Sequence, residues 1–289
     1  MSKIIKSYKA GWAASLNSKR MISLIYLSYL VLALLLILPF YSLFNSVAGT
    51  SLLPESLSKG FDATAFGEFL RDGGQAFKFY LKGLLPWMIL FLFLGVFFQG
   101  GILSWISNAR GKFSSRRFMA QCVSYFWPFA KTCFYTLIIQ LVFVVLVYLP
   151  ISLLLGRENL TDDYIGKTVI IGIAIHIILL IYGTMVAEFT RFFLFRSGSR
   201  KVLKSLWKAI KFSLRKIFKL FGLFLLWSLI PLGLFILFYF VRINWNIDNG
   251  LMVLLLFIVQ QLFVWFRFLL KIQKTSIFYK YLVTVAPSA

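Results

Sequence analysis

The chain has 289 residues, of which 60% are apolar and 19% are aromatic, and its formal net charge is +22. Soluble domains typically contain about 45–50% apolar residues, so this composition excludes an ordinary soluble protein. The basic residues flank long apolar stretches, where anionic lipid headgroups supply the counter-charge, and we therefore expect no nucleic-acid partner.

Six apolar stretches are long enough to cross a bilayer, which takes about 20 residues in a helix. In chain order they are residues 21–46, 83–107, 133–155, 165–194, 217–241 and 250–270. Between the first two, residues 61–72 are predicted as a short helix that ends at Gly73 and Gly74. The sequence thus predicts an all-α, polytopic membrane protein with six transmembrane helices, in a single integral membrane domain, residues 1–289.

A basic amphipathic segment precedes the first, third and fifth spans, and each is predicted as a cytoplasmic helix at the membrane interface. We interpret the chain as three repeated units of an interfacial helix plus a membrane hairpin, approximately residues 1–108, 113–195 and 199–270. A cytoplasmic tail, residues 271–289, follows. The basic residues expected to contact anionic lipid are Arg116, Arg117, Lys201, Lys204, Lys208, Lys211 and Arg215.

Acidic and basic residues lie in different segments between the spans. Eight of the nine acidic residues lie in the segments 47–82, 156–167 and 242–249, whereas most of the 31 Lys and Arg lie in the four alternate segments. Lys and Arg accumulate on the cytoplasmic side of membrane proteins. Both termini are therefore predicted to be cytoplasmic.

Polar residues within or near the spans are candidates for function, because charge is costly in a bilayer. Glu188 and Arg191 are three residues apart and share a helical face, so they can form a structural ion pair, which we favour over a substrate or ion site. His176, without a Cys, His or acidic companion, cannot build a metal site and is interpreted as a neutral hydrogen-bonding residue between helices. We expect neither a metal nor a cofactor.

Other polar residues in the spans indicate helix packing. Gln99 directly precedes Gly100 and Gly101, which predicts a close approach of two helices with one polar contact. Gln140, Gln260 and Gln261 are interpreted in the same way. Neither a Gly-rich phosphate loop nor an H-E-x-x-H or G-x-S-x-G motif occurs in the sequence. The sequence therefore favours a protein without a catalytic site.

Four stretches carry a resemblance to known proteins: Gly100 to Leu103, Phe113 to Phe126, Glu188 to Arg191 and Ser205 to Ala209. With them, the chain resembles a broad group of uncharacterised bacterial six-helix membrane proteins. These are similar to the membrane domain attached to some glycerophosphodiester phosphodiesterases. The resemblance covers most of the chain and implies a bacterial inner (plasma) membrane protein with a link to lipids. This chain lacks the phosphodiesterase domain, so no catalytic residue is implied.

Three hypotheses about function follow. The first is a non-enzymatic protein that binds anionic lipids, or a membrane-protein partner, through its basic interfacial helices. The second is a transporter or permease subunit with a polar path near Gln99, His176, Glu188 and Arg191. The third is an intramembrane lipid-modifying enzyme, which requires a convergent polar cluster that the sequence does not display.

Overall fold

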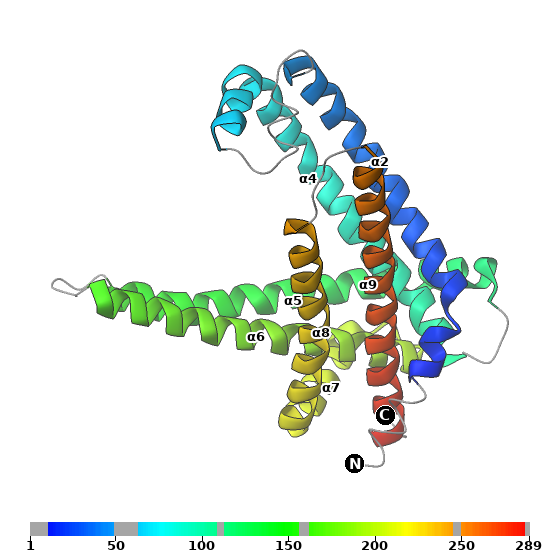
Figure 1. The fold of residues 1–289 in the computed structure, drawn as a ribbon. Coiled ribbons are helices and arrows are strands. Elements are labelled where there is room, and N and C mark those ends of the chain that lie inside the picture. Colours follow the sequence, from blue (N-terminus) through cyan, green and yellow to red (C-terminus); the bar gives the residue numbers. More distant parts are fainter. Residues whose placement is uncertain (1–10, 49–62, 109–112, 156–161, 245–249, 287–289) are drawn as a thin grey trace. The chain divides into compact units, whose positions relative to one another are not determined.

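The computed structural model of the protein describes residues 11–48, 63–108, 113–155, 162–244 and 250–286. Its elements are α2 (Lys19–Ala48), α4 (Ala63–Ser107), α5 (Ser115–Leu155), α6 (Asp162–Ser197), α7 (Val202–Arg215), α8 (Ile217–Ile243) and α9 (Gly250–Val285) (Figure 1). Within these ranges no strand occurs, and six helices, all except α7, are long and apolar enough to cross a membrane. The prediction of an all-α protein with six membrane-spanning helices is confirmed.

Several helices are much longer than the predicted spans. α4 has 45 residues, which corresponds to about 68 Å at 1.5 Å per residue, whereas the hydrocarbon core of a bilayer is about 30 Å thick. Gly73 and Gly74 lie inside this helix, so the prediction that they end a short helix was wrong. A glycine ends a helix when it takes a left-handed conformation. Gly198, with φ of 59°, does so directly after the last residue of α6.

The predicted interfacial segments differ in how they join their spans. The second is continuous with its span in α5, which has 41 residues and runs through Pro128. The third is a separate helix, α7, which a turn at Lys216 divides from α8. Of the first segment, only residues from Gly11 onward are described; residues 11–16 are helical and are followed by a turn. The interfacial location of all three segments stays a prediction.

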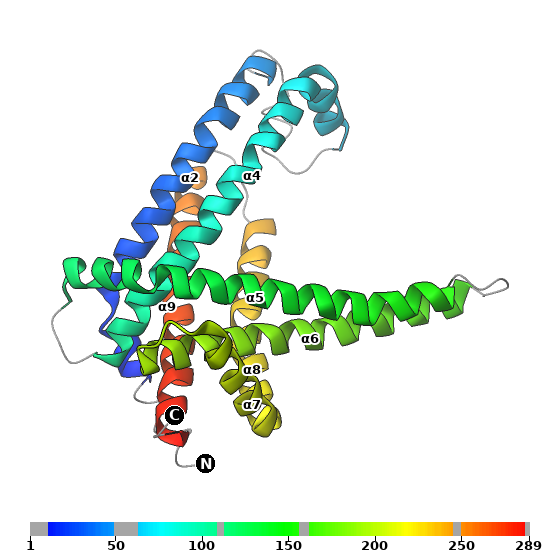
Figure 2. The ribbon, with the colours of Figure 1, turned by 180° about the vertical axis from the view of Figure 1, so that it is seen from behind.

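The chain forms two compact units, and the first comprises Met1–Asn17, Val96–Gly233 and Ile272–Ala289. In this unit α5 and α6 lie side by side as a hairpin (Figure 1, Figure 2). The Gln140 side-chain amide donates a hydrogen bond to the Leu180 carbonyl oxygen across the hairpin, with an N–O distance of 3.3 Å. The predicted role of Gln140 as a polar contact between helices is confirmed.

Aromatic side chains form the core of the first unit. Phe278, on α9, packs edge-on against Phe189 of α6, with ring centroids 6.2 Å apart, and also lies 5.6 Å from the ring of Phe224 on α8. Residues 271–289 were expected to form a cytoplasmic tail, but up to Val285 they continue α9, and Ile277, Phe278 and Leu282 are buried. Residues 277–283, which follow the basic residues at 271 and 274, are apolar or aromatic except for Lys280, so the helix has a face that it can bury.

The second unit comprises Ser18–Gly95 and Leu234–Lys271. Here α2 and α4 lie side by side (Figure 2), and the rings of Phe40 and Tyr80 are 5.2 Å apart. The Tyr26 hydroxyl donates a hydrogen bond of 2.8 Å to the side-chain carbonyl of Gln261 on α9, which confirms the polar contact predicted there. α8 and α9 also contact each other, through rings at Phe238 and Phe263. The two spans of each predicted hairpin therefore pack together.

Candidate functional site

The acidic residue of the predicted polar site forms an ion pair with the end of α9. The Nζ atom of Lys274 lies 3.6 Å from Oε1 of Glu188, and the two side chains are only 19% and 21% exposed, respectively. The same Nζ atom lies 3.5 Å from the centroid of the Phe224 ring. The ammonium group is thus held between a carboxylate and an aromatic face, two arrangements that stabilise a cation away from water.

The partner of Glu188 is therefore on another helix, and the ion pair predicted with Arg191 is not the one that forms among the described residues. Sequence reasoning missed Lys274 because residue 274 was placed in a tail. Its pairing joins α6 to α9. The second carboxylate oxygen of Glu188, Oε2, is buried and has no hydrogen-bond partner within the described part of the chain.

A second contact joins the ends of the same two helices. The guanidinium of Arg196, near the end of α6, donates a hydrogen bond to the backbone carbonyl oxygen of Ala286. Next to Lys274, α9 buries polar side chains: Gln273 and Ser276 have no exposed surface, and their side chains find no hydrogen-bond partner among the residues described. This polar interior of α9 was not predicted either, for the same reason.

His176 lies far from this ion pair. It is twelve residues from Glu188 on the same continuous helix, which separates the two by about 18 Å along the axis. Its ring packs against the ring of Tyr148 on α5, with centroids 5.5 Å apart. Its Nδ1 atom is buried, and in the described ranges it has no hydrogen-bond partner. The predicted hydrogen bond between helices is therefore not made through Nδ1.

Gln99 is half-buried on α4 and precedes two glycines that contact α5 closely. A Cβ atom on Gly100 would lie 2.6 Å from the backbone oxygen of Gln121, so the close helix approach predicted here is confirmed. Among the described residues, no hydrogen bond or ion pair joins the side chain of Gln99 to His176, Glu188 or Arg191. The contacts described at Glu188, at His176 and at the glycines beside Gln99 join helices to one another, and they support helix packing more than a shared site.

The strongest candidate for an interaction surface is α7, which presents three different faces. One face is buried and holds small residues at a spacing of four, Ser205, Ala209 and Ser213. Small residues allow helices to approach closely. Beside them, the ring of Phe212 lies 5.1 Å from that of Phe189 and 5.9 Å from that of Phe193, both on α6. This face attaches α7 firmly to α6.

The other two faces of α7 are exposed. At 100° per residue, the second face carries large apolar side chains, and the third, about 90° further round, carries basic ones. The exposed apolar residues are Leu203, Trp207 and Leu214, continued by Phe218 at the start of α8. The exposed basic residues are Lys204, Lys208, Lys211 and Arg215.

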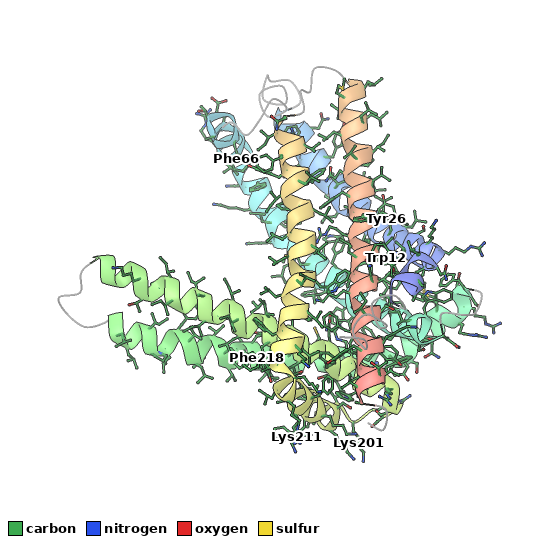
Figure 3. All side chains as sticks on the ribbon, turned by 60° about the horizontal axis from the view of Figure 1, so that its bottom comes forward. Trp12, Tyr26, Phe66, Lys201, Lys211 and Phe218 are labelled. Atoms are coloured by element: carbon green, nitrogen blue, oxygen red, sulfur yellow. The ribbon has the colours of Figure 1, made fainter. Side chains whose placement is uncertain are left out.

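Other basic residues predicted to contact lipid are also exposed. Lys201 lies at the start of α7, and in Figure 3 it projects with Lys211 from the outer edge of this helix. The Nζ atom of Lys211 also lies 5.6 Å from the centroid of the Trp207 ring, so the basic and apolar faces meet at this pair. Arg116 and Arg117 are exposed in the first turn of α5. The structure thus leaves all seven predicted lipid-contact residues accessible.

Comparisons with models of known protein families, with curated proteins and with solved structures found no match.

Proposed function

We propose that this chain is a non-enzymatic, multi-pass protein of the bacterial plasma membrane that associates with anionic lipids through α7. The observation that supports this proposal is the division of α7 into three faces. Its small-residue face is buried against α6, whereas its apolar face and its basic face are both exposed. A helix at a membrane interface needs this pair of faces, since its apolar side enters the acyl region while Lys and Arg reach phosphates.

The start of α5 extends this proposed lipid contact. Arg116 and Arg117 are exposed there, and the charge pattern of the whole sequence predicts that both segments are cytoplasmic. The cytoplasmic leaflet of a plasma membrane is rich in anionic lipid, and each Lys or Arg near it contributes about 1 kcal/mol of attraction. Both termini are cytoplasmic in this proposal. The bacterial origin rests on the resemblance described from the sequence.

Charge reversal on α7 tests the lipid preference. We expect the double variant Lys208→Glu/Lys211→Glu to reduce the preference for phosphatidylglycerol over phosphatidylcholine at least about 30-fold, since two attractions of about 1 kcal/mol each are lost. The measurement is the relative association of the two spin-labelled lipids with the protein in bilayers.

The matched control is Lys78→Glu/Lys82→Glu, which reverses two exposed lysines on α4 with the same change in net charge. This variant should retain most of the preference, because the proposed topology places residues 78 and 82 on the outer side. An equal loss in both variants, or a loss in neither, contradicts the proposal.

The orientation is tested by labelling single cysteines. In a background with Cys122→Ala and Cys133→Ala, we expect a membrane-impermeant maleimide to label Lys78→Cys in intact cells. Lys208→Cys should be labelled only after the cells are permeabilised, because residue 208 is predicted to be cytoplasmic. Labelling of both positions from the outside would refute the topology and, with it, the contact with the cytoplasmic leaflet.

A further inference from the structure

A long groove runs between α2 and α4 within the second unit. It is shallow and open along its length, with a volume of about 920 Å³. It is lined by Lys19, Arg20, Ser23, Leu24, Leu27, Ser28, Val31, Leu32, Leu90 and Leu94. The opposite side of α2 is packed against α9, through Tyr26 and the ring contact between Tyr29 and Phe268. The groove therefore opens on the side of α2 that is turned away from α9.

The chemistry of the groove changes along its length. Its two charged lining residues, Lys19 and Arg20, are both exposed and lie together at one end, at the first turn of α2. From there the lining on α2 continues to Leu32 as mostly Leu and Val, over about 20 Å at 1.5 Å per residue. One leaflet of a bilayer contributes about half of the 30 Å hydrocarbon core, or about 15 Å. The apolar part is thus long enough for one acyl chain.

We infer that this groove holds one anionic glycerophospholipid, a site separate from α7. Its phosphate lies at Lys19 and Arg20, and one acyl chain follows Leu24, Leu27 and Val31. The inference rests on the proposed function for the leaflet, since the same topology places Lys19 and Arg20 at the cytoplasmic surface. A second recess, of about 460 Å³, lies further along α2 and α4. It is lined by Phe79, Tyr80, Trp87 and other uncharged residues, so it has no basic side chain that could bind a phosphate.

Charge argues against another protein copy as the occupant. A second copy of this chain carries a net charge of +22, and its surface would repel the two cations at the end of the groove. A lipid phosphate attracts them. Both long basic side chains can also lie along the groove wall while their charged ends reach the headgroup level, as Lys and Arg commonly do at membrane surfaces.

The test blocks the apolar part of the groove. Val31→Trp fills it at a residue that is 55% exposed, and Ile37→Trp is the matched control, because Ile37 is also 55% exposed on α2 but does not line the groove. The proteins are purified from bilayers of phosphatidylglycerol and phosphatidylcholine, washed stepwise in detergent, and weighed by native mass spectrometry. We expect the unmodified protein and Ile37→Trp to retain one phosphatidylglycerol, and Val31→Trp to retain at least tenfold less.

A second variant tests the headgroup end without changing the groove's shape. Lys19→Gln/Arg20→Gln should remove the preference for phosphatidylglycerol while phosphatidylcholine still binds weakly. Equal retention of the two lipids by the unmodified protein, or unchanged retention by Val31→Trp, would show annular lipid only and overturn the site.

The α7 variant separates this inference from the proposed function. Lys208→Glu/Lys211→Glu should leave the retained lipid in place if the groove holds it. If that variant alone releases the lipid, the groove is not the site, whereas the lipid contact of α7 stands. If only Val31→Trp releases it, the groove site stands independently of α7.

Discussion

Replacing Lys274 with methionine is expected to lower the free energy of unfolding by about 3 kcal/mol. The substitution removes the only ion-pair partner that Glu188 has among the described residues and leaves its carboxylate charge in a largely buried position. Removing one member of a buried ion pair typically destabilises a protein by about 3–5 kcal/mol, and the lower value applies because each side chain here is about one-fifth exposed. The measurement is reversible unfolding in mixed micelles.

Three further variants test whether the loss of the Lys274 charge causes the expected loss of stability. Glu188→Gln should cost less than Lys274→Met, because the ammonium keeps its contact with the Phe224 ring while the carboxylate has no such second contact. The double variant Glu188→Gln/Lys274→Met should recover most of the stability. Lys280→Met, at a half-buried lysine without an ion pair in the described part of α9, is the control. A loss no larger than in this control would refute the prediction.

Gly100→Ala is expected to destabilise the protein by about 1–3 kcal/mol, the usual effect of overfilling a packed interior. The added Cβ atom would lie 2.6 Å from the backbone oxygen of Gln121 and 3.0 Å from the Cβ atom of Tyr125. Neither atom belongs to the movable end of a side chain, so α4 and α5 must separate to admit the methyl group. The same unfolding measurement reports the loss.

Gly222→Ala on α8 is the matched control. A Cβ atom there would meet no atom within 4 Å, so the change should raise stability by up to about 1 kcal/mol through helix propensity alone. If the two alanine variants were equally stable, the close contact between α4 and α5 would carry no energetic weight.

Much of the fold could be predicted because a membrane-spanning helix requires a long run of apolar residues, which is visible in the sequence. The six spans were located from runs of apolar residues, and the contacts of Gln140 and Gln261 were anticipated because a side-chain amide in a span needs a partner on another helix. The ends of the helices were predicted less well. α4 passes through Gly73 and Gly74, and α9 continues to Val285. Both helices extend beyond the predicted apolar spans, because a helix does not have to end where its apolar run ends.

The sequence identified Glu188 as a candidate site residue, but it did not identify the residue that pairs with it. Glu188 stood out as an acid near a span, yet Arg191 on the same helix was the nearest cation that a linear pattern could offer. Lys274 is 86 residues away in the sequence and reaches Glu188 only because α9 packs on α6 and α8. In α7, the pattern showed apolar and basic residues alternating, but it did not distinguish the apolar residues that would be buried from those that would stay exposed.

The sequence by itself determined the six helices of the described ranges that are long and apolar enough to span a membrane, because the length and composition of a helix decide whether it can cross lipid. The alternating charges also predict its orientation, through a bias that acts on each loop separately. Only the tertiary structure decided which cation pairs with Glu188, which faces of α7 stay exposed, and that α2 and α4 leave a groove between them. These properties depend on which distant helices come into contact, and no local pattern of residues encodes that choice.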